Sequence, residues 1–488
     1  MSTPIPRLTP LPITPSSLPY QSGGAFDPVL EPDPLEGAGY VEEEYLLSGE
    51  VDGMPYTTPL VIRRPADPQR FCGRVVVDPV HTMGGAAEWK KLRDYMFRHG
   101  YGYARIASHV SAVDRFLDHD AERYRDCRIQ LPPDLHRIRE EAVNYPPVAS
   151  WFKTGTPAAQ DASFTDILRE WMRVQISEAP ASHGILAQLG ALLKENLADG
   201  PFPGGTVERL YMGGHSQTGL MVLGYVSEMH DTARLADGSQ IYDGYFPTGT
   251  GGTKRNIEMD PELPYIRGYD EPVRGCDAPV VHVLPEGDVH MGVEGGLDGG
   301  AMGGRELVYR RDTGDDPGDK YRLYEVAGIT HNDGRRVPAE HVPADPMAPR
   351  PAHLPWRPLF GALFDLLVQW AENGVAPPPN QVLELEDGKI ARDEHGNARG
   401  GVRSVPLDVP VATYLPTATY LPADSPLWQY GYGTEVPFSK EKLAGLYRNR
   451  EDYLKRFDAR LDELVAERFF LAADVDDLRD EAAKVDIP

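Results

Sequence analysis

A short turn with a serine at its apex most strongly constrains how this chain can fold: Gly213-Gly214-His215-Ser216-Gln217-Thr218-Gly219. An apolar run typical of a strand, 207–212, leads into the turn, and a helix-like run, 220–229, follows it. A serine between a strand and a helix predicts a nucleophile elbow, in which a strained turn holds the hydroxyl clear of the sheet. The G-x-S-x-G pattern expects glycine where Thr218 stands, so an ordinary Gly/Ser turn is the competing interpretation.

Strand-like and helix-like runs alternate along most of the chain around this turn. A hairpin is predicted at 40–64, and helices are predicted at 88–99 and 356–373. Single strands are predicted at 74–78, 101–106, 241–246, 278–284 and 321–326. This alternation predicts an α/β fold with a doubly wound, mainly parallel sheet.

Composition divides the chain into an arm, a main domain and a tail. Residues 1–38 are rich in proline and turn formers, so we expect an extended arm on the surface. Residues 39–435 carry the α/β pattern, with a helical lid insertion predicted at about 110–205. The helix-like runs of that insertion are 114–125, 164–175 and 183–196. Residues 436–488 are charged and predict an exposed C-terminal helical extension.

Charge and hydropathy limit the partners of this chain. It has 488 residues, a formal net charge of −25 and 41% hydrophobic residues, which indicates a globular protein. An acidic chain disfavours nucleic acid and anionic membranes, because both require a basic face. No run approaches the roughly 18 apolar residues of a transmembrane helix, so we expect no membrane partner. A charged helical tail is compatible with a homodimer.

The cysteine content and the composition of residues 1–18 indicate the cellular compartment of the protein. The chain has three widely spaced cysteines, an odd number that predicts neither a disulfide framework nor a zinc site: Cys72, Cys127 and Cys276. Residues 1–18 are rich in Pro, Ser and Thr and lack the apolar core of a secretory signal. We therefore expect a cytoplasmic protein, and we expect no cofactor.

A serine nucleophile needs a histidine base and an acid that orients the histidine. After an elbow of this kind the chain order is serine, then Asp or Glu, then histidine. The predicted strand 278–284 is followed by Glu286 and Asp288, and the strand 321–326 by a small-residue turn that contains His331. We expect Ser216 to act with His331, and we favour Asp288 as the acid because it lies further past its strand. Glu286 stays an alternative.

An oxyanion hole requires two N–H groups beside the serine. The residue after the nucleophile supplies one of them, here the backbone N–H of Gln217. The second is expected from the loop after the strand at 74–78, where His81 and Thr82 are the candidates.

At these residues the chain resembles a known family, the α/β-hydrolase-domain proteins whose elbow reads G-x-S-Q-[ST]-G. The resemblance covers about residues 70–415 and includes the following stretches: Gly214–Gly219, Tyr242-Asp243-Gly244, Glu286–Val289, Glu325–His331 and Asp393–Arg403. It makes Thr218 an ordinary elbow residue, and it implies the α/β-hydrolase fold and a serine hydrolase that uses Ser216, His331 and an acid at Glu286 or Asp288. The loop 78–81 departs from the family pattern, which leaves the oxyanion donors open.

The late segment Asp393–Arg403 has two interpretations. In the functional interpretation, the Asn/Gly-rich turn projects over the active site and Arg403 contacts substrate. In the structural interpretation, the glycines form a tight turn and Arg403 pairs with a carboxylate. We favour the structural interpretation.

Two other functions compete with a serine hydrolase. A metal-dependent hydrolase would use a site formed by His282, Asp288, His290 and His331, since His and Asp at close spacing are good ligands. A non-catalytic binding module would have the α/β-hydrolase fold and bind a ligand without catalysing a reaction. Among hydrolase substrates we expect a small-molecule carboxylic ester first, because ester cleavage needs only the triad and the oxyanion hole; lactones, thioesters and amides stay open.

Overall fold

The computed structural model describes residues 2–20, 33–82, 84–85, 87–149, 164–198, 200–250, 272–294, 309–337, 339–421 and 431–488. The chain forms two compact units. The first contains Met1–Pro247, Gly252–Val280 and Asp316–Lys320. The second contains Thr248–Gly251, Val281–Asp315 and Tyr321–Pro488.

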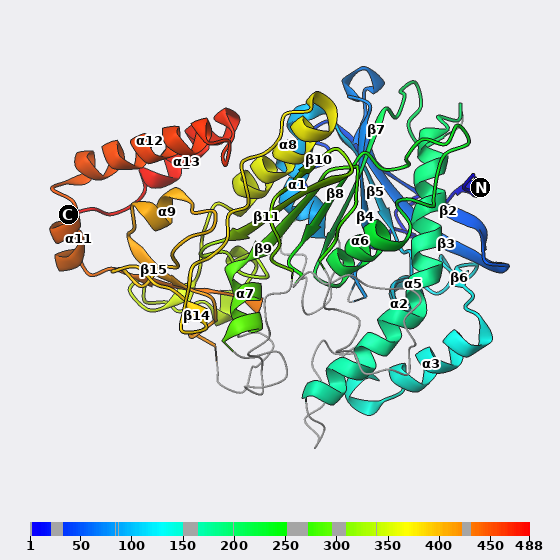
Figure 1. Ribbon diagram of the computed structural model, residues 1–488, viewed down its shortest axis with the longest axis horizontal. Helices are drawn as coiled ribbons and strands as arrows, with labels where there is room; N and C mark the ends of the chain where they lie inside the picture. The colour runs from blue at the N-terminus through cyan, green and yellow to red at the C-terminus, as the bar shows by residue number, and fades with distance from the viewer. Residues whose placement is uncertain are drawn as a thin grey trace. The chain divides into compact units, whose positions relative to one another are not determined.

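The first unit is built on a mixed sheet (Figure 1). Its strand order is β1 (Arg7–Pro10), β2 (Tyr40–Val51), β3 (Met54–Pro65), β5 (Gly102–Ile106), β4 (Arg74–Pro79), β7 (Arg209–His215) and β8 (Gly244–Thr248), with β6 (Arg128–Ile129) beside β3. The strands from β1 to β3 pair antiparallel, whereas β4 pairs parallel with both β5 and β7. The three parallel strands therefore bring their carboxyl ends to one edge, as the predicted doubly wound sheet requires.

The predicted leading hairpin is confirmed as β2 and β3, which pair from Tyr40↔Pro65 to Val51↔Met54. Its two-residue turn is Asp52-Gly53, and both residues have positive φ, 51° and 77°. A tight hairpin turn of this type needs left-handed backbone at both positions, which explains the Asp-Gly pair.

The described helices of the first unit include α1 (Ala87–His99), α2 (Val110–His119), α3 (Pro133–Val143), α5 (Phe164–Lys194) and α6 (Gln217–Glu228). The helix predicted at 114–125 is α2, which begins at Val110 and already ends at His119. Directly after it, the Asp120 side chain accepts the N–H groups of Glu122 and Arg123. The two helices predicted at 164–175 and 183–196 are one helix, and that prediction was wrong. Pro180 lies inside α5, and buried Ile185 and Leu189 anchor the turns beyond it.

The predicted arm contains a paired strand in its described part, because β1 joins the edge of the sheet along β2. Arg123 fixes the following residues by donating to the carbonyl oxygens of Pro12, at 2.8 Å, and Ser17, at 3.1 Å. The rest of the predicted arm, 21–32, and residues 150–163 of the predicted lid lie outside the described residues. The lid function stays a prediction.

The second unit carries most of β9 (Val280–Pro285) and β11 (Asp319–Val326), with β10 (Gly314–Asp316) beside β11. Two smaller sheets have the orders β12 (Arg350–Pro351), β16 (Thr434–Pro437), β15 (Ala412–Leu415), and β13 (Leu385–Glu386), β14 (Lys389–Ile390). Its described helices include α7 (Glu286–Val293), α8 (Trp356–Asn373), α9 (Val405–Asp408), α11 (Lys440–Leu446), α12 (Arg450–Ala466) and α13 (Val475–Ala482). The bounds predicted for α8 are confirmed; the helix ends at Gly374, in the left-handed conformation.

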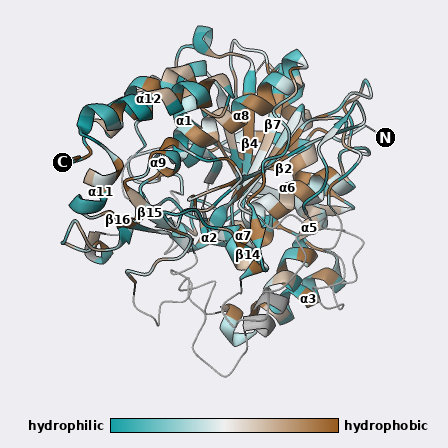
Figure 2. Ribbon diagram, turned by 60° about the vertical axis from the view of Figure 1, so that its left-hand side comes forward, coloured by the Kyte–Doolittle hydropathy of each residue, from teal (hydrophilic) through white to brown (hydrophobic). Residues whose placement is uncertain are grey.

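The C-terminal helices pack within the second unit. One face of α12 is buried and includes Phe457 and Leu461, while Arg460 donates to Asp408 at 2.8 Å. Beyond the helix, the centroid of the Phe469 ring lies 5.7 Å from that of the Tyr324 ring on β11. Figure 2 shows α12 mainly in teal and α8 mainly in brown, as expected for a surface helix and a core helix. No helix in the described part of the chain has both the length and the apolarity to cross a membrane.

Candidate active site

Ser216 occupies the turn between β7 and α6 in the first unit. Its backbone has φ 58° and ψ −120°, a conformation that is uncommon for a residue with a side chain and that costs roughly 1–3 kcal/mol. Although Ser216 is the N-cap residue of α6, its side chain makes no capping hydrogen bond. The strained turn predicted from the sequence is therefore present, and it does not use the hydroxyl to cap the helix.

The glycine and threonine beside the serine are explained by the turn. The Thr218 hydroxyl donates to the carbonyl of His215 at 2.9 Å and accepts its N–H at 2.8 Å. A Cβ on Gly214 would lie 2.4 Å from the Thr218 carbonyl oxygen, so only glycine fits there. Thr218 thus closes the elbow through its side chain, and its departure from G-x-S-x-G does not weaken the turn.

The loop after β4 holds the other predicted oxyanion donors. The Thr82 N–H donates to the Gln217 side-chain oxygen at 3.3 Å, and its carbonyl accepts from Arg115 on α2 at 3.0 Å. The His81 N–H already donates to Gly85 inside the loop, at 2.9 Å. Both N–H groups therefore have a partner, and of the two candidates only Thr82 donates to a residue of the elbow. The backbone N–H of Gln217 begins α6, at the positive end of the helix dipole.

The predicted acid and base meet in the second unit. Asp288 lies in the first turn of α7, directly after β9, and His331 lies in the loop after β11. The Asp288 Oδ1 atom is 2.7 Å from Nδ1 of His331. The Asp288 side chain is only 4% exposed, whereas that of His331 is 21% exposed. A buried carboxylate at Nδ1 fixes the orientation of the imidazole, as a catalytic acid does.

Glu286, the alternative acid, has other partners. Its Oε1 atom accepts from Arg392 at 2.5 Å and its Oε2 atom from the Gly328 N–H at 2.6 Å. Gly328 is the turn residue, with φ 74°, that leads from β11 toward His331. Glu286 therefore fixes the histidine loop instead of contacting the histidine. Sequence reasoning missed Arg392, whose only signal was its place just before the Asp393–Arg403 segment.

A model of one protein family, described as "Alpha/beta hydrolase domain", matches residues 7–480. This chain belongs to that family. It has the α/β-hydrolase fold, with a mixed, mainly parallel sheet and a C-terminal helical region. A search of the curated proteins returned no significant match.

Solved structures similar to this family member include a poly(3-hydroxybutyrate) depolymerase from Bordetella parapertussis, at 13% identity and a TM-score of 0.30. That match covers 70% of this chain and 92% of the depolymerase. The protein Est1E from Butyrivibrio proteoclasticus matches at 12% identity and a TM-score of 0.23, over 49% of this chain and 77% of Est1E. Esterase Est22 matches at 13% identity and a TM-score of 0.28, over 54% and 67%. The assignment rests on the family match.

The four residues of the alternative metal site do not form one in this α/β hydrolase. His282 is fully buried, and its Nε2 contacts the Thr250 carbonyl at 3.0 Å while its Nδ1 contacts the Tyr321 hydroxyl at 2.9 Å. Burial lowers the pKa of His282 to about 4. The residues that the structure describes contain no group of three His, Cys, Asp or Glu side chains that could hold a metal ion.

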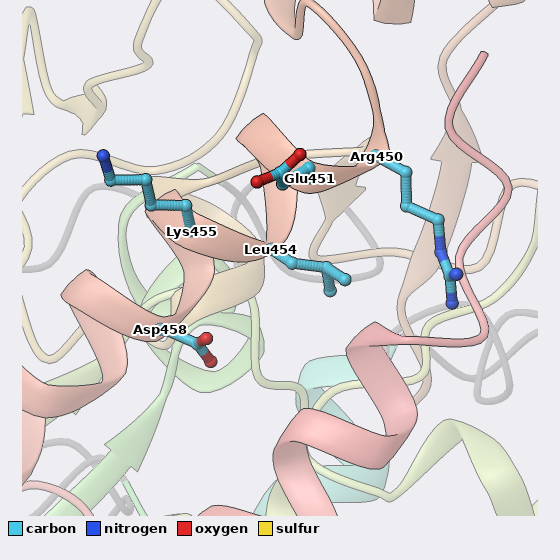
Figure 3. A pocket seen from close by; sticks show the side chains of 5 residues that line it. All are labelled: Arg450, Glu451, Leu454, Lys455 and Asp458. Carbon is cyan, nitrogen blue, oxygen red and sulfur yellow. The ribbon is translucent and has the colours of Figure 1, made fainter.

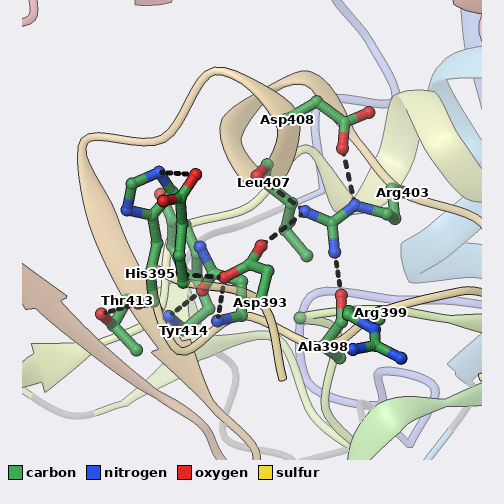
Figure 4. A network of polar contacts seen from close by, with 12 residues as sticks. Asp393, His395, Ala398, Arg399, Arg403, Leu407, Asp408, Thr413 and Tyr414 are labelled. Carbon is green, nitrogen blue, oxygen red and sulfur yellow. Dashed lines mark hydrogen bonds and ion pairs between the residues drawn. The ribbon is translucent and has the colours of Figure 1, made fainter. Parts of the chain in front are cut away.

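The late segment of the family pattern has a structural function (Figure 4). Asp393 accepts the N–H groups of His395 and Asn397 and closes the turn. Arg403 then bridges Asp393, at 3.0 Å, and Asp408, at 2.6 Å. The favoured interpretation of Arg403, pairing with a carboxylate, is confirmed.

A surface hollow beside α12 lacks the residues of a serine hydrolase site. Figure 3 shows its lining, which comes from successive turns of α12: Arg450, Glu451, Leu454, Lys455 and Asp458. Arg450 donates to the Ala483 carbonyl, and the lining of the hollow contains no serine, cysteine or histidine.

Proposed function

We propose that this α/β hydrolase is a serine esterase that cleaves a small carboxylic ester through an acyl-enzyme intermediate. The observation that carries the proposal is the Asp288–His331 hydrogen bond, made by the residues that follow Ser216 in the chain order expected of this reaction. The strained backbone of Ser216 supports it, because such strain is typical of an elbow nucleophile.

In this mechanism Ser216 attacks the ester carbonyl while His331 accepts the hydroxyl proton. Nδ1 of His331 faces Asp288, so the proton is taken by Nε2, and Asp288 stabilises the resulting imidazolium. His331 then gives the proton to the leaving alcohol. Water attacks the acyl-enzyme with His331 as the base again, which releases the acid and restores Ser216.

The negative charge of the tetrahedral intermediate requires two fixed donors. We assign the backbone N–H of Gln217 and that of Thr82 to this role; the oxyanion then replaces the Gln217 side-chain oxygen as the acceptor of the Thr82 N–H. Gln217 is the first residue of α6, so its N–H belongs to the positive end of the helix dipole. Loss of one oxyanion donor typically costs about 10²–10³ in kcat.

A fluorophosphonate probe tests the proposal. We expect it to label the wild type and the control Ser239→Ala, which changes an exposed serine, and not Ser216→Ala. Hydrolysis of p-nitrophenyl acetate and butyrate is expected to fall at least about 10³-fold in Ser216→Ala and to persist in EDTA. A folded wild type that is neither labelled nor active contradicts the proposal and favours a binding module; activity abolished by EDTA favours a metal-dependent hydrolase.

A further inference from the structure

The N-terminal arm reaches the loop that carries Thr82 in the first unit. Tyr20 is 8% exposed, and its hydroxyl occupies the space beside Gly84. A Cβ built on Gly84 would lie 2.0 Å from the Tyr20 oxygen. Gly84 also has a φ of 89°, so both its backbone and the tyrosine exclude a side chain at this position.

Both backbone groups of Tyr20 are fixed by buried partners. Its N–H donates to the Tyr124 hydroxyl at 2.8 Å, and its carbonyl accepts from Arg105 at 2.5 Å. Its ring packs on Phe116, with 4.8 Å between ring centroids. The hydrogen bonds therefore fix the backbone of Tyr20, and packing on Phe116 holds its ring beside Gly84.

Tyr20 and Arg115 approach the same short loop from two elements. Arg115, the neighbour of Phe116 on α2, donates to the Thr82 carbonyl at 3.0 Å. The Gly84 N–H donates to the His81 carbonyl at 2.7 Å, which closes the turn on which Thr82 lies. Contact at Gly84 therefore limits how far the Thr82 peptide group can move.

We propose that Tyr20 is a positioning residue for the oxyanion hole, and that the arm is a working part of the active site. The inference rests on the proposed function for its effect on catalysis. A preorganised N–H stabilises the transition state more than the bound ester, so a loosened loop lowers kcat and leaves KM nearly unchanged. A purely structural tyrosine would lower the thermal midpoint and leave kcat and KM of the folded enzyme unchanged.

Three variants test this. Tyr20→Leu keeps an apolar contact with Phe116 and does not reach Gly84. Tyr20→Phe loses only the oxygen and keeps the ring, whose Cζ and Cε1 atoms lie 3.1 and 3.4 Å from a Cβ built on Gly84. Ile13→Ala is the matched control, because Ile13 lies on the same arm and is 38% exposed. The measurements are thermal midpoint, amide hydrogen exchange in peptides that contain Thr82 and Gly84, and kcat and KM on p-nitrophenyl acetate.

In Tyr20→Leu we expect exchange in those peptides to rise about tenfold and kcat to fall about 10- to 100-fold, with KM within about threefold. Tyr20→Phe is expected to recover most of kcat, and Ile13→Ala to match the wild type. Unchanged exchange, or a kcat of Tyr20→Leu within twofold of the wild type, overturns the inference. If the wild type itself neither hydrolyses the ester nor labels at Ser216, the proposed function fails, and the exchange rates alone decide whether Tyr20 holds the loop.

Discussion

At the residue scale, Asp288 and Glu286 lie two positions apart and have different partners. Asp288 contacts His331, whereas Glu286 contacts Arg392 and the Gly328 N–H. We expect Asp288→Asn to lower kcat about 10³- to 10⁴-fold at an almost unchanged thermal midpoint, because the imidazole loses its orienting charge.

The matched variant is Glu286→Gln, which leaves the partly exposed Arg392 guanidinium without a charged partner at this position. We expect a lower thermal midpoint and a loss of kcat below about tenfold. Steady-state kinetics and thermal unfolding of both variants check this pair. A larger loss of kcat in Glu286→Gln than in Asp288→Asn would reverse the assignment of the acid.

His282 gives the fold a pH dependence of its own. Burial lowers its pKa from 6.5 to about 4, so between these values the unfolded chain binds a proton that the folded chain does not. The stability that His282 contributes is complete above pH 6.5 and is lost as pH falls toward 4, by about 3 kcal/mol at most. Denaturant unfolding of His282→Gln at pH 4.5 and 7.5 is expected to show a smaller pH difference than the wild type; an equal difference would assign the acid sensitivity to other groups.

At the scale of an element, the elbow depends on the Thr218 hydroxyl. Thr218→Val keeps the shape and leaves the buried His215 N–H and carbonyl without this partner. We expect the free energy of unfolding to fall by about 1–3 kcal/mol, and kcat to fall with it, because the serine is no longer held in its strained turn. Thr218→Ser keeps the hydroxyl and serves as the control. Urea unfolding that does not distinguish Val from Ser would refute this account.

At the scale of the whole molecule, the C-terminal helices belong to the same unit as the Asp288–His331 pair. Leu461 on α12 is fully buried there. Leu461→Ala is expected to lower the free energy of unfolding by about 2–5 kcal/mol, and Lys455→Ala, at an exposed position on the same helix, to leave it unchanged. Equal midpoints for the two variants would mean that the helix is not part of the cooperative core.

Much of this protein could be predicted from its sequence because the signals were local. The elbow, the hairpin at 40–64 and the long helix ending at Gly374 depend on turn chemistry and hydrophobic periodicity within short windows. The order of Ser216, the acid and His331 followed from which strand ends carry suitable side chains. The same local reasoning divided α5 in two, because the burial that keeps this helix continuous through Pro180 comes from distant residues.

The tertiary structure decided what depends on contacts between distant parts of the chain. Two carboxylates lie on one turn of α7, and the sequence favoured Asp288 without excluding Glu286. The position of the loop after β11 brings Asp288 to His331 and Glu286 to Gly328. The roles of Arg392 and Tyr20 arise in the same way. Arg392 contacts Glu286, 106 residues away in the chain, and Tyr20 contacts Gly84 on a separate loop. The sequence alone determined the fold and the candidate chemistry, because short-range patterns encode both. Folding determined which side chains orient that chemistry, because orientation is a property of long-range packing.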